Sequence, residues 1–284
     1  MRLNRAFFVK RGFNKFRIGL QILFGRRNRY VPGVEYDSVF LPVHLKFDNQ
    51  VARLITVPPL GQAHPLSGFS GWIYGFKEVR NFRELIYEVI DYLDVSSERH
   101  LRYRNFEGNT FCNVYAYDVC FLLGLLANGI YLPRVWWKDE AAGLIANGVP
   151  LRALYNQTVE ELNCNKLFSW FAEFGPEFGW CSMTGIANLQ EVVNQGLGSL
   201  GVIISRNAAR RGHIALVIPE WAERGAEFTA LWGLDGTLIS PLQSQAGSRN
   251  VKYGHCLLNG ECWFEREDEF AIYYFNAKLN SGNG

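Results

Sequence analysis

Apolar side chains recur at helical spacing in four segments of the chain. The first pattern predicts a helix that follows Asn81, because Asn81 can serve as the N-cap and Glu84 as its partner in a capping box. The second pattern predicts a helix that begins near Asn109 or Thr110 and runs to about Asn128. Its apolar stripe is broad, so we expect this helix to lie in the core.

The other two helical patterns follow in the middle of the chain. One predicts a helix with Thr158 as its cap and Glu161 as the reciprocal partner, ending before Gly175 and Pro176. The other is shorter and predicts a helix over residues 186–194.

From residue 200 onward the apolar positions follow the period of strands. Six apolar, β-branched or aromatic runs are separated by glycine, asparagine or charged turns. They cover residues 200–205, 213–218, 228–234, 237–245, 261–264 and 270–275. Because helices come first and an antiparallel meander follows, the order predicts an α+β fold; a parallel sheet would require alternating elements.

Composition and charge narrow the picture. The chain has 284 residues, of which 48% are hydrophobic and 20% charged, and this excludes a disordered, collagen-like or coiled-coil protein. The net charge of +2 is unevenly spread, because residues 1–34 carry nine basic side chains and no acid, which leaves the remainder at 20 − 27 = −7. The basic character therefore belongs to the N-terminal segment.

The basic segment 1–34 also carries apolar residues, and two interpretations stay open. It would form a basic amphipathic helix that binds an anionic surface, or a terminal helix that packs on the body with its charges in solvent. Lys10, Arg11, Lys15 and Arg17 interrupt any apolar core of a secretory signal, so we predict no signal peptide. A body with a charge of −7 repels phosphate, so no nucleic-acid partner is expected.

Six cysteines in a chain of this length are too few for a disulfide scaffold, and no CxxC pair is present. Cys256 and Cys262 flank a probable turn at residues 259–260 and would form either a disulfide across a hairpin or two free thiols. A zinc site with His255 would lack a fourth ligand at a usual spacing. We therefore predict no metal and no cofactor.

Two residues suggest nucleophilic chemistry. Cys112 lies in the first turn of the predicted core helix, where unpaired N–H groups and the helix dipole favour a thiolate. Among the five histidines, only His213 follows a glycine at the start of an apolar strand, from which its ring can reach the helix that carries Cys112. The alternative is that Cys112 is a small core residue and that His213 is satisfied by a carbonyl.

These residues carry a resemblance to a known family. Thr110-Phe111-Cys112-Asn113, then Gly212-His213-Ile214-Ala215-Leu216-Val217, then a polar residue on the next strand resemble the papain-like fold of the CHAP amidases and NlpC-type endopeptidases, which are cell-wall hydrolases. The segment QSQAGSRN at residues 243–250, which precedes Trp263-Phe264, also resembles bacterial and phage members of this group. The resemblance spans residues 105–275.

The resemblance implies an architecture. A catalytic helix would open the domain and pack on an antiparallel sheet, and the 213 − 112 = 101 residues between the two motifs imply a helical insertion that compact members lack. The predicted domains are a basic amphipathic segment (1–34), an extension with one helix (35–104) and a papain-like catalytic domain (105–284). Four tryptophans of the insertion would line a groove for sugar or peptide, or else belong to the core: Trp136, Trp137, Trp170 and Trp180.

The resemblance also implies roles. Cys112 would be the nucleophile and His213 the base, and a third residue on the next strand would orient the imidazole. Gln245 is preferred for this third role because the Ala-Gly that follows it leaves room; Gln243 is the second choice and Asp235 the fallback. The predicted substrate contacts are Gln243, Asn250 and Trp180.

The expected function is that of a cysteine amidase or endopeptidase that cleaves peptidoglycan stem peptide. Two alternatives stay open: an effector protease or deamidase that acts on a host protein, and a catalytically inactive structural or binding relative. Without a signal peptide, the protein would be made in the cytoplasm and act at the bacterial wall after delivery by lysis or a secretion apparatus, or within a virion. The sequence makes no prediction of the oligomeric state.

Overall fold

The structure is a computed structural model, in which the chain divides into two compact units. The described residues are 81–98, 101–105, 108–124, 129–147, 158–195, 199–258 and 261–276. The first unit includes residues 133–161, and the second includes residues 47–132 and 162–282. The predictions for the basic segment 1–34 and for residues 35–80 lie outside the described residues.

The first unit contains a two-stranded antiparallel ribbon and one helix. Strand β1 (Val135–Trp137) pairs with β2 (Val159–Glu161), and helix α4 (Ala141–Ala146) follows β1. All three residues of β1 are buried, including Trp136 and Trp137, which are 6% and 8% exposed. Of the two interpretations of these tryptophans, burial in a strand favours the core over a groove.

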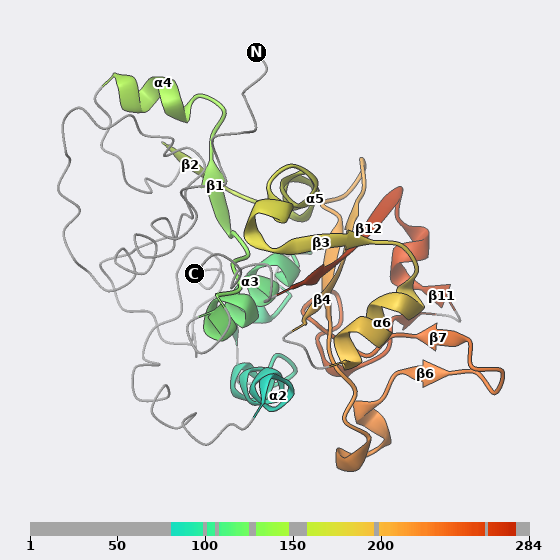
Figure 1. The fold of residues 1–284 in the computed structure, drawn as a ribbon. Helices are drawn as coiled ribbons and strands as arrows, with labels where there is room; N and C mark the ends of the chain where they lie inside the picture. Colours follow the sequence, from blue (N-terminus) through green and yellow to red (C-terminus); the bar gives the residue numbers. More distant parts are fainter. Residues whose placement is uncertain are drawn as a thin grey trace. The chain divides into compact units, whose positions relative to one another are not determined.

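The second unit is built on a six-stranded antiparallel sheet (Figure 1). The strand order is β3-β12-β4-β5-β8-β9, so four of the strands form a meander with β12 and β3 added beside β4. The strands are β3 (Trp180–Met183), β4 (Gly201–Arg206), β5 (His213–Val217), β8 (Gln243–Gln245), β9 (Val251–Gly254) and β12 (Glu269–Phe275).

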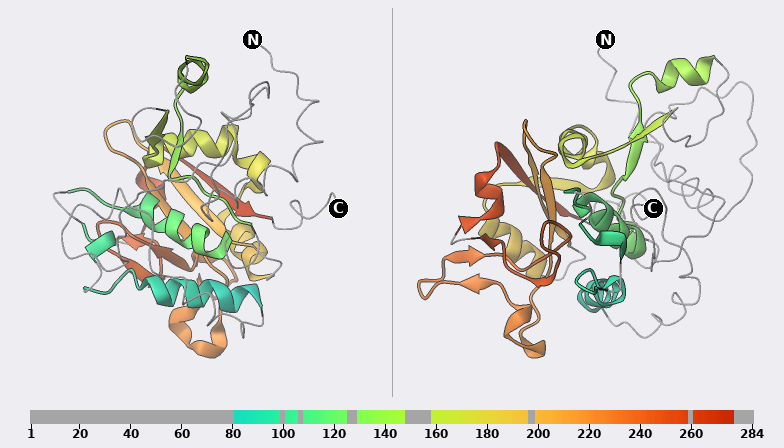
Figure 2. Two further views of the ribbon diagram at one scale, coloured as in Figure 1. Left: turned by 90° about the vertical axis from the view of Figure 1, so that its left-hand side faces the viewer. Right: turned by 180° about the vertical axis from the view of Figure 1, so that it is seen from behind.

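Helices cover both faces of this sheet (Figure 2). Helix α6 (Ile186–Asn194) packs on the face that Ile203, Ala215 and Ile272 present. Helices α3 (Cys112–Leu123) and α5 (Cys164–Glu173) lie on the other face, where Phe171 of α5 stacks on Tyr273 with the ring centroids 4.7 Å apart. The mixed α+β class with an antiparallel sheet is thus confirmed.

Helix α2 (Phe82–Leu93) packs on α3 in the same unit. Its predicted cap is present: the side-chain oxygen of Asn81 accepts from the Glu84 N–H at 3.0 Å, and the two side chains are bonded at 2.9 Å. Helix α6 also begins and ends as predicted.

The domain boundary at residue 104 stays a prediction. No helix in the described ranges is long and apolar enough to cross a membrane.

The prediction for the third helix is wrong. Residues 159–161, placed in that helix by the expected cap at Thr158, form β2, and α5 begins only at Cys164. The actual N-cap is Asn163, whose side chain accepts from the Lys166 N–H at 3.0 Å. The spacing of Thr158 and Glu161 imitates a capping box, but Thr158 is fully buried beside a strand.

The later strands are shorter than predicted. Pro241 divides the predicted strand over residues 237–245 into β7 (Leu238–Ser240) and β8, because proline has no N–H to donate to a sheet. The run 261–264 contains only β11 (Glu261–Cys262), which pairs with β10 (Leu257–Leu258) and continues into the short 3₁₀ helix η9 (Trp263–Arg266). The run 228–234 contributes only β6 (Leu231–Trp232), the partner of β7. Strands β3 and β9 were not predicted.

The core helix α3 carries one charged side chain, and that charge is fully buried. The carboxylate of Asp118 accepts from Arg102 Nε at 2.6 Å and from Arg102 Nη2 at 2.9 Å. The Tyr103 hydroxyl donates to the same carboxylate at 2.7 Å. Arg102 and Tyr103 belong to the short 3₁₀ helix η4 (Leu101–Tyr103), so the ion pair ties this segment to α3.

Replacement of Arg102 by methionine should therefore destabilise the fold. Arg102→Met leaves the carboxylate of Asp118 buried without its cation, which should lower the free energy of unfolding by about 3–5 kcal/mol. The double variant Arg102→Met/Asp118→Leu should recover part of the loss, and Arg104→Met, at an exposed neighbour, should change stability by less than about 0.5 kcal/mol. Denaturant unfolding measures all three; equal losses in the single and double variants would contradict the argument.

Candidate active site

Cys112 is the first residue of helix α3, as predicted, and it is 3% exposed. The residue before it, Phe111, occupies the N-cap position and makes no side-chain cap. The predicted caps Asn109 and Thr110 thus do not cap the helix, and the Asn109 side chain accepts from Arg211 instead. Cys112 therefore lies at the positive end of the helix dipole, with no capping side chain there.

His213 is the first residue of strand β5, and its ring meets Gln245 on the neighbouring strand β8. His213 Nε2 and Gln245 Oε1 are 2.8 Å apart. Since an amide oxygen only accepts, Nε2 carries the proton that is shared with Gln245. This leaves Nδ1 as the ring nitrogen that can act on the Cys112 thiol, whose pKa the charge and the hydrogen bond of His213 lower.

The structure thus brings Cys112, His213 and Gln245 together. The register explains the reach of Gln245: Leu216 pairs with Ser244, which places Gln245 diagonally opposite His213. The small residue expected after Gln245 is also needed, because a Cβ on Gly247 would lie 3.2 Å from His213 Cε1. The catalytic roles of the three residues stay predictions.

A second cysteine joins the site, and the sequence analysis did not identify it. Cys164 is the first residue of α5, it is 3% exposed, and its sulfur lies 3.4 Å from that of Cys112. Its position repeats that of Cys112, at the start of a helix on the same face of the sheet. The signal was Asn163: recognition of Asn163 as the N-cap would have placed Cys164 in the first turn.

Electrostatics separate the two thiols. The pKa of Cys112 lies well below its usual range. The hydrogen bond with Cys164 lowers it most, and the charge and hydrogen bond of His213 and a backbone hydrogen bond from Ile214 lower it further. Burial acts in the opposite direction. The hydrogen bond to Cys112, together with burial, raises the pKa of Cys164 well above its usual range. The lowered pKa favours the thiolate form of Cys112, and the raised pKa favours the thiol form of Cys164.

The imidazole is shifted in the complementary direction. Burial lowers the pKa of His213, but the charge of Cys112 and hydrogen bonds to Cys112 and Gln245 outweigh it and raise the pKa above its ordinary value. A lowered thiol pKa and a raised imidazole pKa together favour the state in which Cys112 is a thiolate and His213 an imidazolium. The titration belongs to the pair rather than to either residue.

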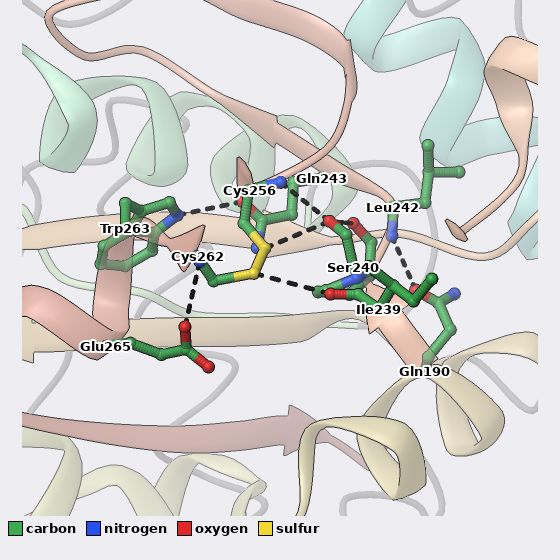
Figure 3. Close-up of a disulfide and its surroundings, with 10 residues drawn as sticks. Gln190, Ile239, Ser240, Leu242, Gln243, Cys256, Cys262, Trp263 and Glu265 are labelled. Carbon is green, nitrogen blue, oxygen red and sulfur yellow. Dashed lines mark hydrogen bonds between the residues drawn. A yellow bond between two sulfur atoms is a disulfide. The ribbon is translucent and has the colours of Figure 1, made fainter. Parts of the chain in front are cut away.

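Trp263 covers the imidazole and was not predicted to do so. Its ring stands edge-on to that of His213 with the centroids 4.5 Å apart, and its Nε1 donates to Gln243 Oε1 at 3.1 Å. An aromatic ring here keeps water from competing for the bond between His213 and Gln245. Trp263 follows a disulfide between Cys256 and Cys262, and its backbone N–H donates to the Cys256 carbonyl at 3.2 Å (Figure 3).

The disulfide decides between the interpretations of Cys256 and Cys262. The two sulfurs are bonded to each other, so neither is a free thiol and neither can ligate zinc as a thiolate. His255 is exposed, and its ring contacts the Thr229 carbonyl. Among the described residues no group of three or more histidine, cysteine or acidic side chains is arranged to hold a metal ion.

Helix α5 also holds the loop that leads into His213. The Asn165 side chain donates to the carbonyls of Asn207 and Arg210, both at 3.0 Å, and accepts from the Asn207 N–H at 3.1 Å. Gly212 follows in a left-handed conformation with φ +65°, where a Cβ would meet the Ser205 carbonyl oxygen. The segment that we predicted to be an insertion therefore contributes Cys164 and fixes the loop before His213.

The predicted substrate contacts are not placed for that role. Trp180 is fully buried, and its Nε1 donates to the Tyr131 carbonyl at 2.8 Å, so it belongs to the core. Gln243 is 1% exposed and supports Trp263. The Asn250 amide is engaged by the Gly247 N–H and by two backbone carbonyls. Strand positions and loop bonds turn these three side chains inward in this structure, and their contact with a substrate stays a prediction.

Two further expectations are corrected. The fallback Asp235 lies in the exposed turn between β6 and β7, where it accepts from the Thr237 N–H at 3.0 Å, away from the imidazole. Trp170, the remaining candidate for a groove, is 3% exposed.

An open cleft of about 580 Å³ lies beside α5. Neither Cys112 nor His213 lines it. Its lining is polar or charged except for one alanine: Asn165, Lys166, Ser169, Arg206, Asn207, Ala208, Asp268 and Glu269. The cleft begins one residue beyond Cys164.

Comparisons with protein-family models, with curated proteins and with solved structures found no match to this chain.

Loss of the Gln245 side chain should change the titration of the imidazole. Gln245→Ala removes a hydrogen bond that raises the pKa of His213, so that pKa should fall. An NMR titration of the His213 ring measures it, with Gln195→Ala, at an exposed glutamine, as the matched control that should titrate like the wild type. Identical titration curves for Gln245→Ala and the wild type would show that the contact has no electrostatic effect.

Proposed function

We propose that the protein is a cysteine hydrolase of the papain-like type that cleaves an amide bond. The observation that carries the proposal is the grouping of Cys112 and His213, each of which shifts the pKa of the other, with Gln245 bonded to Nε2 of the imidazole. A nucleophile, a base and a residue that orients the base are the parts that covalent catalysis requires. Their origin, from a helix N-terminus and two neighbouring antiparallel strands, agrees with the resemblance to CHAP and NlpC-type enzymes.

The residues would act in sequence. The Cys112 thiolate attacks the amide carbonyl carbon, and the oxyanion that forms is stabilised by the Cys112 backbone N–H at the start of α3. The His213 imidazolium gives its Nδ1 proton to the departing amine, which leaves an acyl-thioester. Neutral His213 then takes a proton from water, and the resulting hydroxide attacks the thioester and releases Cys112. Gln245 holds the ring in place throughout.

Substrate entry imposes a condition on this mechanism. Cys112 is 3% exposed, so the residues that cover its sulfur must move before a carbonyl carbon can approach. The open cleft beside α5 offers amide, hydroxyl and charged groups of both signs, which suit a peptide better than an apolar ligand. We propose peptidoglycan stem peptide as the substrate from the resemblance, with action at the bacterial wall after delivery. A host protein as substrate is the alternative.

Removal of either reacting group should abolish hydrolysis. Cys112→Ala and His213→Ala should each lower kcat by at least about 10³-fold without unfolding the protein, because both residues lie at element ends. The assay is digestion of purified sacculi, with new amine termini identified by mass spectrometry. Matched controls are Cys181→Ala and His255→Ala, which should retain activity.

The same experiment separates the alternatives. Circular dichroism reports whether each variant is folded. If both variants unfold, the residues belong to the core and the hydrolase proposal fails. If the wild type releases no fragments from sacculi but cleaves or deamidates a protein substrate in a Cys112-dependent manner, the effector alternative replaces the wall substrate.

Alkylation should reveal the thiolate without any substrate. Because the Cys112 pKa is held well below its usual range, more of this thiol stays ionised as the pH falls than of an ordinary thiol, which is only about 0.3% ionised at pH 6. His213→Ala should therefore slow the labelling of Cys112 by iodoacetamide at pH 6 by about 10–100-fold, with a smaller difference at pH 9. Peptide mapping resolves Cys112 from Cys181, which serves as the internal reference. Equal rates at pH 6 would indicate a structural cysteine.

A further inference from the structure

We propose that Cys112 and Cys164 form a reversible disulfide when the protein meets a peroxide, and that this bond switches the nucleophile off. The regulatory part of the proposal rests on the proposed function, whereas formation of the bond does not. The sulfurs of Cys112 and Cys164 come from two different helices and lie 3.4 Å apart, and the mechanism above makes little use of this contact.

The distance is short enough for a bond after a small movement. A disulfide joins sulfurs at about 2.05 Å, so the two atoms must approach by about 1.4 Å. Both cysteines are first residues of their helices, at the ends rather than within packed turns. Rotation of the two side chains with a slight shift of either helix end would supply this movement.

The two sulfurs are chemically unequal, as the reaction requires. His213 and the backbone of Ile214 act on Cys112 and favour its thiolate form, whereas Cys164 contacts Cys112 through its sulfur at 3.4 Å. The thiolate reacts with peroxides and the thiol does not. Cys112 is thus the sulfur that is oxidised first, and Cys164 is the sulfur that resolves it.

The steps balance with hydrogen peroxide as the oxidant. The Cys112 thiolate attacks one peroxide oxygen, an S–O bond forms and the O–O bond breaks, and the hydroxide that leaves takes the His213 proton to become water. The Cys164 thiol then attacks the Cys112 sulfur. The S–S bond forms, the S–O bond breaks, and the hydroxide that leaves takes the Cys164 proton to become the second water. Overall, two thiols are oxidised and one hydrogen peroxide is reduced to two waters.

The remaining cysteines are not placed to substitute for Cys164. Cys120 lies eight residues along α3 from Cys112, which is about 12 Å on a helix. Cys181 lies on β3, three strands from β5, which is about 14 Å in a sheet. Cys256 and Cys262 are bonded to each other.

Burial of the pair also fits a small oxidant. Cys112 and Cys164 are each 3% exposed, which hinders a peptide carbonyl more than a molecule close to water in size. A disulfide would protect Cys112 from sulfinic acid, which thiols do not reverse. Peroxide would thus inactivate the enzyme in a form that a reducing thiol restores.

Peptide mapping tests the bond directly. The reduced full-length protein is treated with a few equivalents of hydrogen peroxide, quenched with acid and digested, and the peptide that joins Cys112 to Cys164 is sought by mass spectrometry. The wild type and Cys181→Ala should both yield it. Cys164→Ser, which keeps the size of the side chain, should instead accumulate Cys112 sulfinic acid about tenfold faster than the wild type. His213→Ala should form the linked peptide more slowly.

Activity measurements separate this proposal from the proposed function. Dithiothreitol should restore hydrolysis in the peroxide-treated wild type but not in Cys164→Ser. If hydrolysis is normal and peroxide yields sulfinic acid without the linked peptide, the disulfide proposal is overturned while the hydrolase stands. If the linked peptide forms but no hydrolysis is found in any state, the bond stands and its regulatory role is overturned.

Discussion

The buried pairing of Asp118 with Arg102 is the constraint on which the position of the nucleophile depends. Helix α3 is apolar on almost every side, so burial of apolar surface alone leaves its rotation about the axis poorly defined. One fully buried carboxylate removes this freedom, because it must meet its guanidinium. A hydrogen bond of 2.6 Å between Tyr115 and Ser244 on β8 fixes the same helix against the sheet. The direction of the Cys112 sulfur follows from these polar contacts.

The base is positioned by the sheet, and a side chain of α6 secures the two strands. Gln190 of α6 donates to the Ile218 carbonyl at 3.0 Å and accepts from the Leu242 N–H at 2.9 Å. These two backbone groups lie where the chain leaves β5 and where it enters β8. The register that they maintain places Gln245 within reach of His213 at the other end of the pair. A polar contact far from the imidazole therefore contributes to its orientation.

The fold class and the three central residues of the site could be predicted because each depends on a local pattern. Cys112 follows from a helix start, His213 from a glycine before a strand, and Gln245 from alternation along a strand. Cys164 and Trp263 could not be predicted in the same way. The capping pattern at residues 158–161, four residues long, wrongly placed Cys164 in the interior of a helix rather than at its start. Trp263 reaches His213 only because a disulfide-closed turn brings it there. Trp180 was misread because composition does not distinguish an aromatic core from an aromatic groove.

The pairing of β1 with β2 has a consequence for how the chain between α3 and α5 is organised. Val135 and Glu161 are direct partners across this ribbon, so the chain leaves on β1 and returns on β2 at neighbouring positions. Partners in an antiparallel pair have Cα atoms only about 4.5–5.5 Å apart. The stretch from 136 to 160 is thus a closed excursion whose length does not affect the separation of its ends. Such a stretch can grow, shrink or be exchanged for another module during evolution while the chain on either side keeps its path.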